Sequence, residues 1–285
     1  MDILKNTDAM GKRIFADLEK INFIRTSTSA EETRAANIIK DELAKEGMEA
    51  TIEEFMVETA DIHKVSLKAL GKEWEIKGYR RSGSTPPEGL TAEFAYVQQG
   101  NDLYDKKGKI VLVNSGRLNE EVYEKLVRYG VAGFLTWNGN VSDVREDTDL
   151  GERELRYWAL RYGTVPGGVL RAIDAMELVK GEPETVTFTL IQDDVTRPSR
   201  NVVLQIKGTE DTNENITFGA HFDSVEFSHG VYDNGVCLSV AHFFHADNDR
   251  RIFFVADRID RRFLRLDDLS RIDNLDLFFL ICMLF

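Results

Sequence analysis

The sequence predicts an α/β fold in which helices pack on a β-sheet, and three patterns support this prediction. Apolar and polar residues alternate with a period of two along residues 186–190 and 202–206, which is typical of strands. Apolar residues recur every three or four positions along residues 8–25 and between Ser29 and Gly47, which is typical of helices. Residues 109–137 follow the order strand, helix, strand, which favours a right-handed crossover connection.

Composition limits the classes of partner. The chain has 285 residues, which suffices for one large domain or two medium ones, and 42% of them are hydrophobic, which suffices for a core. Its formal net charge of -13 disfavours nucleic acid and anionic membranes. We therefore expect no nucleic-acid partner and no membrane partner, whereas peptides, small molecules and metal ions remain possible.

Cysteine content and the N-terminal residues indicate a compartment. The two cysteines, Cys237 and Cys282, are too few for a disulfide framework and form no Cys-x-x-Cys motif. Residues 1–15 lack the basic and then apolar pattern of a signal peptide. The longest uncharged apolar run, Leu277–Phe285, is far shorter than the roughly 20 residues of a membrane span. We expect a cytoplasmic protein.

Residues 1–61 are predicted to begin the sheet domain. A first helix is expected along residues 8–25. Ser29 is placed to cap a second helix, with Glu32 as its partner in a capping box, and Gly47 supplies a left-handed stop. A strand along residues 50–57 should follow.

Residues 62–183 are predicted to form a separate unit. The expected elements are strands at 109–113 and 132–137 and helices at 118–129 and 171–180. The acidic stretch 143–154 is interpreted as a solvated loop, and residues 163–168 as a turn.

Residues 184–236 return to strands and carry the residues with chemical potential. The strand 216–220 leads directly into His221, and open α/β sheets bind ligands at the carboxyl ends of their strands. The carboxylate of Asp223 can accept a hydrogen bond from a ligating imidazole and fix its tautomer. Asp233 lies in a small, polar turn, and one carboxylate can bridge two metal ions about 3.5–4 Å apart.

These motifs resemble a known family. Gly219–Val225 (GAHFDSV) and Gly230–Gly235 (GVYDNG) resemble the signature of metallopeptidase family twenty-eight, which comprises zinc aminopeptidases and their carboxypeptidase and receptor relatives. Residues 104–180 resemble its protease-associated insert through GKIVLV at 108–113 and GVAG at 130–133. The resemblance implies a mixed-sheet zinc-exopeptidase sandwich, incomplete here, with an inserted protease-associated α/β domain.

The resemblance also implies roles for individual residues. His221 would ligate one zinc ion, Asp233 would bridge two, and Asp223 would act in catalysis by orienting His221. The peptide bond between Asp233 and Asn234 would be cis. A metal-bound water would attack a peptide substrate that has a free amino terminus, so the implied function is that of an aminopeptidase-type hydrolase of peptide N-termini.

The sequence departs from the family after residue 236. The family requires a pair of glutamates after the bridging aspartate, yet no glutamate follows Glu226 in this chain. We interpret residues 237–285 as an aberrant tail produced by a frameshift near Val236, which predicts an inactive chain. One alternative is that His242, His245 and Asp249 complete a metal site. A second is a non-catalytic binding module with the peptidase fold. The oligomeric state stays open.

Overall fold

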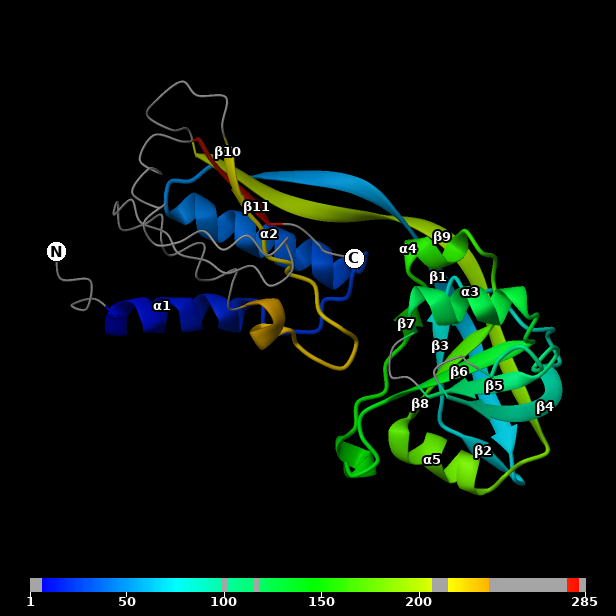
Figure 1. Cartoon of the computed structure of the whole chain (residues 1–285). Helices are drawn as coiled ribbons and strands as arrows, with labels where there is room; N and C mark the ends of the chain where they lie inside the picture. The colour runs from blue at the N-terminus through cyan, green and yellow to red at the C-terminus, as the bar shows by residue number, and fades with distance from the viewer. Residues whose placement is uncertain (1–6, 99–101, 115–117, 207–214, 236–275, 282–285) are drawn as a thin grey trace, which may run out of the picture. The chain divides into compact units, whose positions relative to one another are not determined.

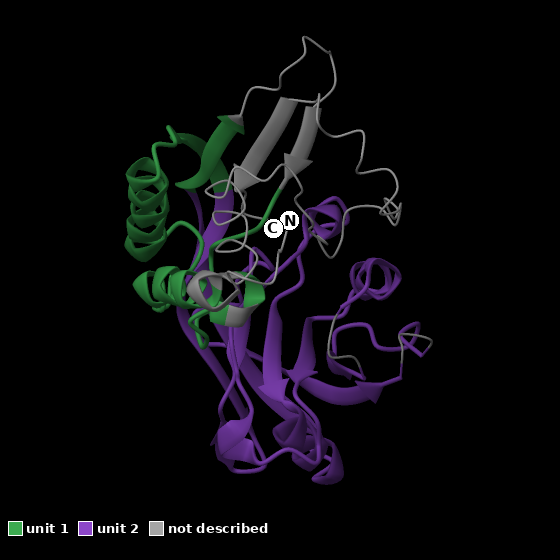
Figure 2. Cartoon of the chain, turned by 90° about the vertical axis from the view of Figure 1, so that its left-hand side faces the viewer, with its two compact units in different colours: residues 1–57, 197–285 green, residues 58–196 purple. Residues whose placement is uncertain are grey.

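The computed structural model describes residues 7–98, 102–114, 118–206, 215–235 and 276–281. The chain divides into two compact units (Figure 2): the first comprises Met1–Val57 and Arg197–Phe285, and the second comprises Glu58–Thr196. Two long strands, β1 (Thr51–Ala69) and β9 (Thr185–Ile206), pass through the boundaries between the units. Each is longer than its sequence prediction, and β9 joins the two strands expected at 186–190 and 202–206. The segment 62–183 lies within the second unit.

The first unit combines two helices with a small mixed sheet (Figure 1). Its elements are α1 (Thr7–Lys20), α2 (Ala30–Lys45), the start of β1, the end of β9, β10 (Asn215–Phe218) and β11 (Asp276–Ile281). β11 pairs parallel with β10 and antiparallel with β9, so the sheet is mixed as predicted. The helix α1 ends at Lys20, earlier than residue 25, because the chain turns there and Arg25 enters the interior of the unit.

The start of α2 confirms one half of the predicted capping box and corrects the other half. The Ser29 hydroxyl accepts a hydrogen bond from the Glu32 amide at 3.0 Å. The Glu32 carboxylate accepts instead from the amides of Thr28 and Arg200, at 2.7 and 3.0 Å, and from the Ser199 hydroxyl at 3.0 Å. Glu32 therefore ties the start of α2 to β9, and burial raises the pKa of its carboxyl.

The apolar face of α2 packs on this small sheet and on one residue after β10. Val202 and Leu204 from β9, together with Phe222, are buried against the following α2 residues: Ala35, Ala36, Ile39 and Leu43. Fully burying a side chain of the size of Phe222 contributes about 1.5–3 kcal/mol. This packing anchors the segment that carries His221 to the core of the first unit.

The second unit contains a mixed sheet in the order β9, β4, β5, β6, β8, β3, β7. β4, β5, β6 and β8 are mutually parallel, whereas β9 and β3 pair antiparallel with β4 and β8. The remaining bounds are β2 (Lys72–Trp74), β3 (Lys77–Arg80), β4 (Leu90–Val97), β5 (Ile110–Val113), β6 (Gly133–Asn138), β7 (Arg153–Glu154), β8 (Gly167–Arg171), α3 (Glu120–Arg128), α4 (Tyr157–Leu160) and α5 (Ala172–Lys180).

Alternation along β5 explains how helices cover both faces of this sheet. Val111 and Val113 belong to the cluster that contains residues of α3 and α4, whereas Ile110 and Leu112 belong to the cluster that contains Leu178 of α5. All four β5 side chains are buried, which is typical of a parallel strand covered on both faces. Within the described residues, no helix is long and apolar enough to cross a membrane.

Candidate metal centre

Three predicted site residues lie in the segment that follows β10, which we call the site loop and define as residues 221–233. His221 comes shortly after the strand ends at Phe218, and Asp233 lies in a short turn, Val231–Gly235. Between them, Phe222 is buried in the core of the first unit. The loop thus begins at a strand end, as predicted, and its course is fixed by a buried aromatic side chain.

The structure brings His221, Asp223 and Asp233 together. The Nδ1 atom of His221 lies 3.0 Å from Oδ1 of Asp223, and its Nε2 atom lies 3.1 Å from Oδ1 of Asp233. An ionised carboxylate only accepts hydrogen bonds, so Asp223 holds the proton on Nδ1. Nε2 is then the nitrogen that can ligate a metal, and it faces the carboxylate predicted to share that metal.

The two carboxylates differ in their access to solvent. The side chains of His221 and Asp223 are 25% and 20% exposed, whereas that of Asp233 is 85% exposed. Asp223 therefore sits on the protected side of the imidazole and Asp233 on its open side. An ion or ligand can reach Asp233 and the Nε2 atom of His221 from solvent.

Electrostatics favour the charged form of this imidazole. The hydrogen bond with Asp223, and the negative charges of Asp223 and Asp233, hold the pKa of His221 above its usual value, although burial opposes them. With a proton on each nitrogen, His221 pairs with both carboxylates at once. A divalent cation bound between Nε2 and Asp233 would replace the proton on Nε2.

The backbone at Asp233 has the form that the family resemblance implied. The peptide bond between Asp233 and Asn234 is cis, and Asp233 has non-helical φ and ψ angles of -115° and 93°. Gly230, just before this turn, has a left-handed φ of 59°. An added Cβ there would lie 2.8 Å from Cβ of Ser224, so the turn requires glycine for both its angle and its close packing.

The donor set present fits part of a zinc site. Zinc accepts imidazole nitrogen and carboxylate oxygen as ligands, and catalytic zinc usually keeps three protein ligands. Among the residues that the structure describes, no group of three or more His, Cys, Asp or Glu side chains is arranged to hold a metal ion. The alternative ligands His242, His245 and Asp249 lie outside the described residues. His221 and Asp233 therefore offer two of the donors that such a site needs.

Arg25 is a residue of this region that the sequence did not single out. It is fully buried, and its side chain donates to the backbone carbonyls of Phe222, His229 and Gly230 in the site loop. The sequence around Arg25 contains no pattern that would distinguish a buried arginine from one exposed to solvent. Only the fold shows that it faces the site loop.

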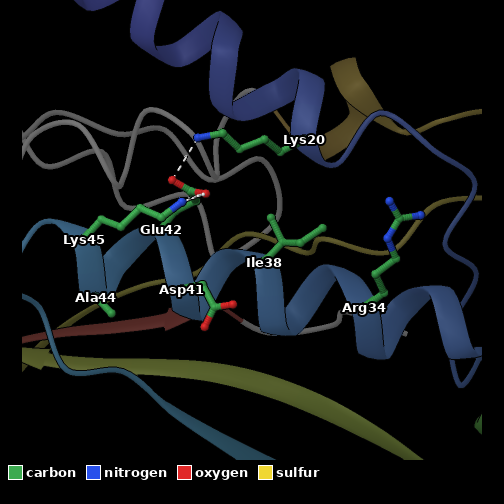
Figure 3. Close-up of a pocket in the computed structure, with 7 residues that line it drawn as sticks. All are labelled: Lys20, Arg34, Ile38, Asp41, Glu42, Ala44 and Lys45. Atoms are coloured by element: carbon green, nitrogen blue, oxygen red, sulfur yellow. Dashed lines mark hydrogen bonds and ion pairs between the residues drawn. The ribbon is translucent and has the colours of Figure 1, made fainter.

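A groove on the first unit, of about 740 Å³, is separate from these residues (Figure 3). It is lined by residues of α2 together with Lys20 at the end of α1: Lys20, Arg34, Ile38, Asp41, Glu42, Ala44 and Lys45. The carboxylate of Glu42 pairs with Lys20 and Lys45, each at 2.8 Å. Three of the five charged residues that line the groove are thus paired with one another.

Sequence comparison links the site loop to a known family. Residues 201–256 match the model of Peptidase family M28. The match contains His221, Asp223 and Asp233, and it continues beyond Val236, where the composition changes. Over 244 residues the chain is 25% identical to Aminopeptidase YwaD from Bacillus subtilis (strain 168), which covers 81% of this chain and 50% of that protein.

Solved structures of aminopeptidases share the fold. BSAP, a zinc aminopeptidase from Bacillus subtilis, matches 95% of this chain and 60% of its own, with a TM-score of 0.67 at 19% identity. An aminopeptidase from Aneurinibacillus sp. strain AM-1 matches 82% of this chain and 58% of its own, with a TM-score of 0.61 at 22% identity. A peptidase M28 precursor from Shewanella amazonensis SB2B matches 97% of this chain and 66% of its own, with a TM-score of 0.65 at 14% identity.

The chain spans 50% of the curated relative and 58%, 60% and 66% of these solved structures. Since their identities lie below 25%, the solved structures establish the α/β fold, and the family match locates the site loop within it. The chain is therefore similar to peptidase family M28 over residues 201–256, which include His221, and it shares its fold with solved aminopeptidases.

Proposed function

We propose that His221 and Asp233 are zinc ligands of an aminopeptidase-type site and that Asp223 orients His221. One observation supports this proposal above the others: a single imidazole lies between two carboxylates, at 3.0 Å from Asp223 and 3.1 Å from Asp233. The protected carboxylate fixes the tautomer, and the exposed one faces the nitrogen left for a metal. Relatives named as zinc aminopeptidases support zinc as the ion.

When bound, zinc supplies a water molecule with a pKa lowered to about 7 and polarises the carbonyl of the scissile peptide bond. The residues of this chain hold and orient that ion. Asp223 keeps the proton of His221 on Nδ1, so that Nε2 stays available as a ligand. Asp233, at 85% exposure, lies where a peptide can approach from solvent. The proposed substrate is a peptide with a free amino terminus.

We also propose that the chain as printed does not complete this reaction. The deprotonation of an attacking water needs a general base, and residues 227–285 contain no glutamate. A frameshift near Val236 would account for the change in composition, whereas the family match extends to residue 256, and translating the gene in its two other frames tests this explanation. If neither frame encodes a glutamate pair after Asp233, that explanation is wrong. Residues 62–183 are proposed as a protease-associated insert.

Zinc analysis of the purified full-length chain tests the site itself. We expect zinc to bind, and His221→Ala and Asp233→Ala to weaken binding by at least about tenfold. His63→Ala is the matched control, because His63 also pairs with an aspartate, Asp193 at 2.9 Å, but lies in the second unit. Equal zinc affinity of wild type and His221→Ala would refute the assignment.

Activity and folding separate the remaining functions. Hydrolysis of an aminoacyl-nitroanilide by the wild-type chain would refute the proposed inactivity and support a complete enzyme. A soluble, folded chain that binds no zinc but retains a ligand would favour the non-catalytic binding module. Failure to obtain folded protein would favour a defective gene product.

A further inference from the structure

Arg25 is a buried cation whose charge is met by backbone carbonyls. It lies between α1 and α2 and has an exposed fraction of 0%. Among the described residues, no carboxylate lies within ion-pair distance of its guanidinium, and burial lowers its pKa while the charge of Asp223 raises it. A buried, uncompensated charge is costly, so an arginine in such a place needs other partners.

The guanidinium finds those partners at both ends of the site loop. Its Nε donates to the carbonyl oxygen of Phe222, while its Nη1 and Nη2 donate to those of His229 and Gly230, the last at 3.1 Å. Nη1 also donates to the carbonyls of Ile21 and Phe23, at 2.8 and 3.1 Å. One side chain therefore joins the start of the loop, its end and the segment after α1.

Backbone hydrogen bonds of Arg25 reinforce this connection. The Arg25 amide donates to the Ser224 hydroxyl at 2.9 Å, and the Ser224 amide donates to the Arg25 carbonyl at 3.1 Å. Ser224 and Phe222 are the two neighbours of Asp223 in the sequence. Both residues that flank Asp223 are thus bound to Arg25.

The packing around Gly230 leaves little room for a side chain. A Cβ added to Gly230 would lie 3.3 Å from Nη2 of Arg25 and 3.2 Å from the carbonyl oxygen of Asp233. The guanidinium, Gly230 and the backbone of Asp233 are therefore in close contact. The position of Arg25 fixes where the loop leaves toward Asp233.

We propose that Arg25 is a positioning residue for the metal centre: by binding the carbonyls of Phe222, His229 and Gly230, it sets the separation of His221 Nε2 and the Asp233 carboxylate. The part that concerns metal affinity rests on the proposed function. The part that concerns the geometry of the loop does not. Arginine suits this role because its planar fork directs several N–H groups at fixed angles, whereas lysine offers three donors on one flexible atom.

Two substitutions at Arg25 distinguish the effect of the planar guanidinium group from the effect of its positive charge. Arg25→Lys keeps the positive charge and loses the fork, and Arg25→Met loses both. Arg34→Lys is the matched control, because Arg34 lies on α2 in the same unit and stacks on Phe23 without contacting the site loop. All three variants are prepared as the full chain, and their folding is checked by circular dichroism.

Hydrogen exchange of the peptide that spans the site loop is the first measurement. We expect exchange to accelerate by about tenfold or more in Arg25→Lys and Arg25→Met, while the peptide that spans α2 keeps its wild-type rate. Arg34→Lys should match wild type in both peptides. Unchanged exchange of the site loop in both Arg25 variants would overturn the proposal, and acceleration of both peptides alike would show a general loss of stability and overturn it as well.

Zinc affinity is the second measurement. In Arg25→Lys we expect a loss of about tenfold to a hundredfold, the range seen when residues that support metal ligands are changed. Wild-type affinity in a folded Arg25→Lys variant would overturn the positioning role. If the wild-type chain itself binds no zinc, the proposed function fails, and the exchange rates alone decide whether Arg25 positions the loop.

Discussion

Replacing Gly230 with alanine should destabilise the first unit more than the same replacement at Gly47. Both glycines have left-handed backbones, with φ angles of +59° and +77°. Alanine in that region costs about 1 kcal/mol, so this contribution is shared by both variants. At Gly47 no atom lies within 4 Å of the added Cβ, whereas at Gly230 it would meet Ser224 Cβ at 2.8 Å.

The close contact between the added Cβ and Ser224 determines how much more the free energy of unfolding falls in Gly230→Ala than in Gly47→Ala. Overpacking of a tight site costs about 1–3 kcal/mol in addition to the conformational strain. We therefore expect the free energy of unfolding to fall by about 1 kcal/mol in Gly47→Ala and by about 2–4 kcal/mol in Gly230→Ala. Zinc affinity should fall only in Gly230→Ala, since Gly230 contacts Arg25 and the backbone of Asp233.

Urea unfolding followed by circular dichroism measures both variants. Tryptophan fluorescence provides an internal control, because Trp74, Trp137 and Trp158 all lie in the second unit and should report no change. The slope of the free energy against urea should stay constant, which shows that the same surface is exposed on unfolding. If the two variants agree within about 0.5 kcal/mol, the close contact at Gly230 does not exist in solution.

Three further predictions concern buried or half-buried polar groups. Asp223→Asn should weaken zinc binding about 10–100-fold with little change in the urea midpoint, and unchanged affinity would show that Asp223 does not orient His221. Glu32→Ala leaves three donors unpaired between α2 and β9 and should cost about 2–4 kcal/mol by circular dichroism, so a loss below about 1 kcal/mol would contradict its structural role. Burial raises the pKa of Tyr123 to about 12 from 10.0, so the unfolded chain loses this proton first and stability falls as pH rises from 10 to 12. Tyr123→Phe should flatten that fall, which amounts to at most about 2 kcal/mol by fluorescence-monitored unfolding, and an unchanged slope would refute this origin.

The fold class predicted from the sequence is confirmed, and the three candidate site residues singled out from the sequence lie together in the structure, while their roles stay predictions. Alternation, helical spacing and the residues around His221 are all visible along a short stretch of chain. The cis peptide bond after Asp233 was implied by the family resemblance and is present in the structure. The sheet and its helices follow from the same patterns, whereas the mixed direction of the strands was implied by the family resemblance.

Sequence reasoning missed the features that depend on contacts between residues far apart in the sequence. Glu32 has the spacing of a capping-box residue, yet its carboxylate binds Ser199 and Arg200, which are far away in the sequence. Arg25 contacts the site loop across 197 and 205 positions. Strand lengths were also underestimated, because β1 and β9 continue through polar residues and pair with each other, a contact between segments distant in the sequence.

The pairing of β1 and β9 has a consequence for how the chain is assembled. Contacts between the two strands occur on both sides of the boundary: Thr51 bonds the Val203 carbonyl at 3.5 Å, and His63 bonds Asp193 at 2.9 Å. The chain therefore leaves the first unit along β1 and returns to it along β9, and these two strands are adjacent and run in opposite directions. Residues 58–196 thus form one continuous insertion whose two ends lie in paired strands, and replacing them with a short hairpin turn is expected to leave the contact between Thr51 and Val203 in place.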